Sequence, residues 1–182
     1  QNNPNALCYL GVLYFEGYGV NQDINLAKKY LEQSSDFGNS DASNYLGCLY
    51  LDGLGVQQDL TLAREYFELS AKYNNANSFH NLGVLYQRGL GVNQDYLIAK
   101  EYYELSAKQN NPHSINNLGW LYFNGLGVKQ DYSLAMKYYE SAAQQNHPAA
   151  LYNLGLCYEI GKSVKQDYLK AIEYYELAGK QN

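Results

Sequence analysis

The sequence repeats itself every 36 residues. Five Leu-Gly pairs are each followed by a Tyr three residues after the Gly and by a second Gly three residues later. The five pairs are Leu10-Gly11, Leu46-Gly47, Leu82-Gly83, Leu118-Gly119 and Leu154-Gly155. Five copies account for nearly all of the 182 residues. A fixed period of about 20 to 50 residues is typical of stacked supersecondary units, so we expect one elongated array rather than separate globular domains.

The third copy predicts a first helix followed by a glycine turn. Ser78, Leu82 and Tyr86 recur at helical spacing and give this segment an apolar stripe. The turn Gly-x-Gly-Val begins at Gly89, and its first Gly can adopt the left-handed conformation at a helix end. In the fourth copy Pro112 marks the helix start, because Pro is favoured at the first helical position.

A second helix follows the turn in every copy. A Gln-Asp pair precedes it, and an Asp there can cap the free N–H groups at the helix start. The Asp residues are Asp23, Asp59, Asp95, Asp131 and Asp167. Ala and Tyr columns then recur at helical spacing, as in Ala99 and Tyr102. The Gly inside each first helix costs about 1 kcal/mol relative to Ala, which favours close helix contact there. The identical columns therefore build the scaffold.

Composition, charge and residue spacing argue against several classes of function. The net charge is −5 and no basic stripe occurs, which argues against nucleic-acid binding. No apolar run approaches the roughly 20 residues of a membrane helix. His80, His113 and His147 occupy different columns without Glu or Cys at ligand spacing, and no nucleophile–base set is present. We therefore predict a protein that is not an enzyme and that has no cofactor, no metal site and no membrane insertion.

Three cysteines, Cys8, Cys48 and Cys157, fall in three different columns. An odd number in unrelated columns argues against a disulfide framework and favours small buried apolar residues. Free cysteines favour the cytoplasm, although the sequence does not fix the compartment.

The whole pattern, from Leu-Gly through Gly-x-Gly-Val and Gln-Asp to the Ala and Tyr columns, resembles the Sel1-like repeat, a relative of the tetratricopeptide repeat. The resemblance implies an all-α fold: an α-solenoid of antiparallel helix pairs in a right-handed superhelix, with the first helices lining the concave side. It also implies an adaptor function, and the family includes secreted and host-directed proteins. We expect one array with repeats at about 3–38, 39–74, 75–110, 111–146 and 147–182, an excerpt of a longer array. The fifth copy departs from the pattern at Ser163, which predicts a strained or differently shaped turn.

If identical columns are scaffold, function lies in the columns that vary on the first helices. We choose the positions six and three before the repeat Gly and one, four and five after it, which share one side of the helix. Asn and Arg there can hydrogen-bond, while Trp120, the only Trp, and Phe123 form an aromatic pair. Trp120 is either an interface anchor or a packing variant of an otherwise apolar column. Beside that face, the column two residues before the Gly reads Tyr9, Tyr45, Asn81, Asn117 and Asn153. Three Asn two residues before the Gly either grip a peptide backbone or only hold adjacent helices together. The predicted partner-binding residues are Asn44, His80, Asn81, Arg88, Asn116, Asn117, Trp120, Phe123, Tyr152 and Asn153.

The leading hypothesis is a non-enzymatic scaffold that binds a protein or peptide in its concave groove, as a monomer. Two alternatives remain open. One is a structural spacer or self-associating array that stacks through Tyr-rich ends. The other, which the sequence favours less, is a metal-binding or enzymatic repeat protein that uses His80, His113 and a cysteine.

Overall fold

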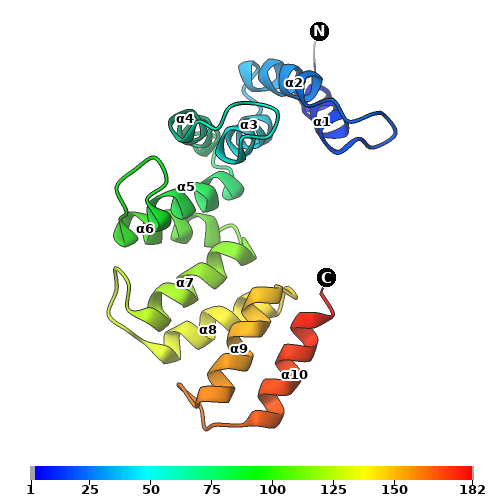
Figure 1. Cartoon of the computed structure of the whole chain (residues 1–182). Coiled ribbons are helices and arrows are strands. Elements are labelled where there is room, and N and C mark those ends of the chain that lie inside the picture. The colour runs from blue at the N-terminus through cyan, green and yellow to red at the C-terminus, as the bar shows by residue number, and fades with distance from the viewer. Residues whose placement is uncertain (1–2, 182) are drawn as a thin grey trace. The chain divides into compact units, whose positions relative to one another are not determined.

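The computed structural model describes residues 3–181, and this part of the chain consists of ten α-helices without a strand (Figure 1). Each repeat supplies one pair of helices, as the periodicity predicts. The first helices of the five repeats are α1 (Pro4–Glu16), α3 (Ser40–Asp52), α5 (Ala76–Arg88), α7 (Pro112–Asn124) and α9 (Pro148–Ile160). The second helices are α2 (Ile24–Asp36), α4 (Leu60–Ala71), α6 (Tyr96–Ala107), α8 (Tyr132–Ala143) and α10 (Tyr168–Gly179).

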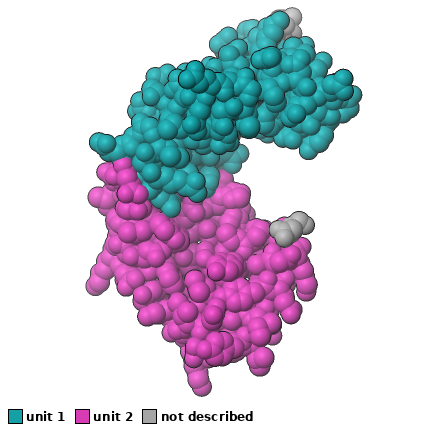
Figure 2. Space-filling view, viewed as in Figure 1, with its two compact units in different colours: residues 1–93 teal, residues 94–182 magenta. Residues whose placement is uncertain are grey.

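The helices form two compact units that divide after Asn93 (Figure 2). The first unit holds α1 to α5, in which each helix packs on the next and α1 also contacts α3. The second unit holds α6 to α10, packed in the same consecutive order. Sequence neighbours are therefore spatial neighbours within each unit, which is the arrangement of stacked repeats.

Both ends of every first helix follow the predicted signals. The residue before each first helix accepts backbone N–H groups of the first turn with its side chain, and these residues are Asn3, Asn39, Asn75, Asn111 and His147. Each first helix ends on a Gly with a left-handed φ between 67° and 74°. The Asp of the Gln-Asp pair caps each second helix as predicted.

The Gln of that pair has a role that the sequence did not indicate. Its Nε2 donates to a backbone carbonyl in the last turn of the first helix, over 2.7 to 2.8 Å in four copies. The residues are Gln22, Gln58, Gln130 and Gln166. Since the last carbonyls of a helix have no intrahelical partner, the Gln-Asp pair closes one helix and opens the next.

The Gly inside each first helix allows the close contact that its retention predicts. A Cβ built on Gly47 would lie 2.4 Å from Cε1 of Phe67, and one on Gly119 would lie 2.6 Å from Cε1 of Tyr139. Any side chain would therefore push the two helices of a repeat apart. This close contact explains why the free-energy cost of a glycine inside the first helix is tolerated.

The turn of the fifth repeat keeps the geometry of the others despite its sequence. Ser163 has a φ of 69°, while the second glycines of the other four turns lie between 66° and 73°. The turn is thus not differently shaped. The strain that we expected is carried by a non-Gly residue in the left-handed region.

The three cysteines are free. Cys8 and Cys157 are buried, as predicted, whereas Cys48 is half-buried. Burial is the main cause that raises the pKa of each thiol to about 11, so all three are protonated at neutral pH.

Candidate interaction surface

The columns chosen from the sequence lie on one surface of the first helices, which we call the first-helix face. Its two edge columns, six residues before and five after the repeat Gly, are exposed in all five repeats. Its two inner columns, one and four residues after the Gly, are half-buried in all five. The inner columns therefore form the packed base of a shallow surface, and the edge columns are its solvent-exposed borders.

The asparagines of this face link neighbouring first helices. Asn81 donates from Nδ2 to Oδ1 of Asn44 over 2.9 Å, and Asn153 donates in the same way to Asn116 over 2.9 Å. Asn116 is only 7% exposed, so little of it can reach a partner. Both links favour the reading in which these amides hold adjacent helices together. Asn117 is half-buried on α7.

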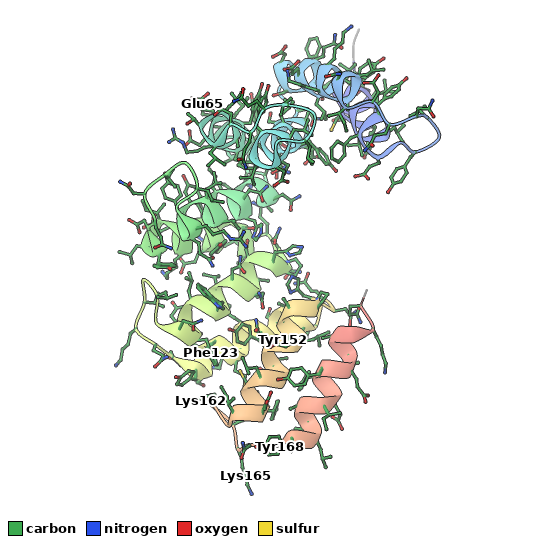
Figure 3. All side chains as sticks on the ribbon, in the orientation of Figure 1. Glu65, Phe123, Tyr152, Lys162, Lys165 and Tyr168 are labelled. Carbon is green, nitrogen blue, oxygen red and sulfur yellow. The ribbon has the colours of Figure 1, made fainter. Side chains whose placement is uncertain are left out.

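The two aromatic residues predicted as anchors differ in their surroundings. The ring of Phe123 packs edge-on against Tyr132 at 5.1 Å and lies tilted against Tyr139 at 6.4 Å, with both partners on α8 (Figure 3). Phe123 therefore contributes mainly to packing within its repeat. Trp120 is half-buried, and its ring retains accessible surface on α7.

The remaining predicted residues are spread over both units. Tyr152 on α9 is 53% exposed, and its ring lies tilted 5.4 Å from that of Tyr175 (Figure 3). Arg88 is exposed at the end of α5, and His80 is half-buried on the same helix. Four of the ten predicted residues, Asn44, His80, Asn81 and Arg88, belong to the first unit, and the other six belong to the second.

A groove in the first unit runs across α1, α3 and the start of α5. It has a volume of about 660 Å³, and its polar and aromatic lining is concentrated on α1 and α3. The lining residues are Asn5, Cys8, Tyr9, Val12, Asn39, Asp41, Asn44, Tyr45 and Asn77. Of the predicted residues only Asn44 is among them. The groove's tyrosines occupy the column in which later copies have Asn, and that replacement was the sequence signal for them.

Several polar groups in the groove keep hydrogen-bonding capacity. Asn5 accepts at Oδ1 from Asn39 Nδ2 over 2.8 Å, and Asp41 accepts at Oδ1 from Asn75 Nδ2 over 2.7 Å. Asn44 accepts at Oδ1 from both Asn81 and Ser78. Among the described residues nothing bonds to the Nδ2 groups of Asn5 and Asn44 or to Oδ2 of Asp41.

The two tyrosines of the groove offer ring surface. Tyr9 is 72% exposed and Tyr45 is 37% exposed. Partial burial is the largest cause of a raised pKa at Tyr45, and the nearby carboxylate of Asp41 adds to it, so its hydroxyl stays neutral near pH 7. Neutral, exposed Tyr rings beside amides are common at protein interfaces.

A pair of histidines replaces the usual asparagine link in the second unit. His147 caps α9, and its Nε2 lies 2.9 Å from Nδ1 of His113 on α7. Burial, and then the charge of His113, lowers the pKa of His147 to about 4. His147 thus serves as a helix cap, and its ring is neutral near pH 7.

Neither a metal cluster nor a spanning helix was found within residues 3–181. No three His, Cys, Asp or Glu side chains in that range gather closely enough to hold a metal ion. No helix in that range has the length and apolarity to cross a bilayer.

Solved structures with similar folds define the class of protein. A Sel1 repeat protein from Oxalobacter formigenes superposes with a TM-score of 0.92 at 31% identity, over 100% of this chain and 74% of that one. A protective antigen of uropathogenic Escherichia coli with an SLR fold superposes with a TM-score of 0.85 at 30% identity, over 98% of this chain. The chain spans only 38% of that antigen's length. Together with the ten helices, these similarities define an α-solenoid of helix-pair repeats.

The family follows from the sequence match. The model of the Sel1 repeat matches five times, at residues 4–39, 40–74, 80–111, 112–147 and 148–182. The chain belongs to the Sel1 repeat family. Proteins of this family are generally non-enzymatic and commonly act as scaffolds for protein–protein interaction.

Two further comparisons add less. An immunity protein from Pseudomonas aeruginosa superposes with a TM-score of 0.70 at 21% identity, over 98% of this chain and 66% of that one, and this similarity concerns the fold alone. A comparison with curated protein sequences gave no significant match.

Proposed function

We propose that this chain is a non-enzymatic interaction scaffold that binds a protein or peptide segment on its first-helix face. The observation that carries the proposal is the groove of the first unit, in which the amide nitrogens of Asn5 and Asn44 are free of partners among the described residues. Amide N–H groups are suited to peptide carbonyls, because a peptide backbone presents an acceptor at every residue.

Identical and variable columns of the repeat have different roles, and this difference supports the same function. The identical residues are occupied in building the repeats: glycines allow close packing, Gln and Asp close the helix ends, and tyrosine rings stack within each pair, as Tyr50 and Tyr66 do at 5.7 Å. The residues that differ between copies lie on the first-helix face, and two of its columns are exposed in all five repeats. Variable residues on a rigid frame are the usual means by which repeat proteins choose their partners.

A selection experiment tests this function. A phage-displayed library of random nonapeptides is selected on the immobilised protein, and enriched peptides are synthesised for fluorescence anisotropy. We expect binding that Tyr45→Ala or Trp120→Ala weakens about tenfold or more, the effect of losing one interface anchor. Lys137→Ala, an exposed change on α8, is the control and leaves affinity unchanged. Equal affinity for all of these variants would exclude the first-helix face as the binding surface.

A further inference from the structure

The groove of the first unit has a charge that identifies the chemistry of its occupant. The two helices that line most of it, α1 and α3, carry Glu16, Asp41 and Asp52 and contain neither Lys nor Arg. Two basic residues of the second helices of this unit form ion pairs: Lys28 lies 3.0 Å from Glu32, and Arg64 lies 3.5 Å from Glu68. Lys29 on α2 is exposed and is not part of the groove lining. The first helices α1 and α3 therefore present an acidic surface in the groove.

Asp41 is the acidic group within the groove itself. It is exposed in the first turn of α3, and one of its oxygens accepts from Asn75. That hydrogen bond fixes the carboxylate against α5 and leaves Oδ2 free for a donor from outside. A carboxylate held in place loses less entropy on pairing than a freely rotating one, and a charge-assisted hydrogen bond to a cation is stronger than a neutral one.

The aromatic rings of the groove suit the same kind of ligand. The exposed rings of Tyr9 and Tyr45 line the groove together with Asp41. The face of a Tyr ring attracts an ammonium or guanidinium group within about 6 Å. The protein already uses such contacts, since Lys170 lies over the ring of Tyr158 at 5.1 Å. A carboxylate and two rings thus converge on a cation, while the amides of Asn5 and Asn44 supply donors for carbonyl oxygens.

From these groups we infer that the groove lined by α1, α3 and Asn77 binds an extended peptide segment that carries a lysine or arginine side chain. The basic group lies at Asp41 between the rings of Tyr9 and Tyr45. The peptide carbonyls accept from the free Nδ2 groups of Asn5 and Asn44. The inference rests on the proposed function and specifies the partner's chemistry and the place where it binds.

The test compares two variants that make the same change of charge. Asp41→Asn removes the charge in the groove and keeps an oxygen that can accept from Asn75, so the local fold is preserved. Glu65→Gln removes an equivalent exposed charge on α4, outside the groove (Figure 3). Tyr45→Phe and Tyr45→Leu form a second pair, because only the latter loses the ring.

Random nonapeptides are selected on the wild-type protein, and the enriched peptides are titrated against all four variants. We expect Lys and Arg to be enriched about threefold over the input, and Asp41→Asn to weaken binding about tenfold, as for loss of a charge-assisted contact. Glu65→Gln and Tyr45→Phe keep wild-type affinity, Tyr45→Leu does not, and added NaCl weakens binding.

The outcomes separate this inference from the proposed function. Enriched peptides without basic residues that still require the Tyr45 ring would overturn the inference and leave the proposed function intact. An equal loss for Asp41→Asn and Glu65→Gln would also overturn it, because the effect would then be one of overall charge. Failure to enrich any peptide would count against both.

Discussion

His147 donates a hydrogen bond from Nε2 to Nδ1 of His113 over 2.9 Å. The direction follows from the other side of the ring, where Nδ1 of His147 accepts the backbone N–H of Ala150 over 3.3 Å. Because Nδ1 is occupied as an acceptor, the proton of the neutral ring is on Nε2. A second proton on His147 would bind at Nδ1, turn this acceptor into a donor and break the helix cap at Ala150.

This pair makes the stability of the fold depend on pH. An unfolded His titrates near pH 6.5, whereas the pKa of His147 is lowered to about 4 in the fold. Between these values the unfolded chain binds a proton that the folded chain does not, so the free energy of unfolding falls as the pH falls from 6.5 to 4. The loss amounts to roughly 1 to 3 kcal/mol, at about 1.4 kcal/mol for each pKa unit. Well above pH 6.5 His147 is neutral in both states and contributes no pH dependence.

Urea unfolding at pH 7.5, 6.5, 5.5 and 4.5 measures this loss. His147→Asn is the matched control, because Asn111 caps the preceding first helix in the same way. We expect the variant to lose less stability on acidification than the wild-type protein, although carboxylates titrate in both. Identical pH profiles for the two proteins would show that His147 is not the group responsible.

Gly47→Ala tests the close approach inside a repeat. The new Cβ would lie 2.4 Å from the Phe67 ring, so we expect destabilisation of about 1 to 3 kcal/mol, as for other overpacked cores. Gly179→Ala is the control, since its Cβ would meet nothing within 4 Å and Ala favours the helix. A thermal melt in which both variants match the wild-type protein would refute the packing role of Gly47.

Ser163→Gly tests the strain in the last turn. Ser163 has a φ of 69°, where Gly has no Cβ penalty, so the substitution should stabilise the second unit by about 0.5 to 1 kcal/mol. The reverse change, Gly127→Ser, should destabilise it, because a Cβ there would lie 2.7 Å from Cβ of Tyr96. The midpoints of urea unfolding measure both effects. A midpoint for Ser163→Gly below that of the wild-type protein would contradict the predicted strain at Ser163.

Asn81→Ala tests whether the asparagines act as links between first helices. The substitution removes the donor to Asn44 and the longer contact to Sγ of Cys48, so we expect a loss of about 1 kcal/mol, the usual value of one hydrogen bond. Asn25→Ala, an exposed site on α2, should cost less. The result is read from chemical unfolding of both variants, and equal midpoints would argue that Asn81 is free to serve a ligand.

The sequence predicted the helices and turns of the repeats well, because their boundaries depend on local rules. Helix starts at an N-cap, helix ends at the left-handed Gly and Asp caps each require only a few adjacent residues. The Gly and Asp signals recur in all five copies. The contact of Gly47 with Phe67 could also be anticipated, since only a close neighbour explains a glycine retained inside every first helix.

The interaction surface was predicted less well, because side chains on one helix face share their hydrogen bonds with neighbouring helices. Asn116 was expected to reach a partner, yet it is buried and bonded to Asn153. Conversely, Tyr9 and Tyr45 were not among the predicted binding residues, although both line the groove. The sequence identifies a column but not whether the packing of adjacent repeats leaves it open.

The links between repeats give the chain a particular tolerance to changes of length. Asn39 with Asn5, Asn75 with Asp41, and His147 with His113 each join residues that are 34 positions apart. A deletion of residues 39–74 would remove one whole period and bring Asn75 to the place of Asn39, opposite Asn5. Every helix would regain an equivalent neighbour, whereas a deletion of any other length would leave caps and acceptors out of register. Whole repeats can thus be added or removed. Gain or loss of one would change the length of the array and would keep the hydrogen bonds between neighbouring repeats.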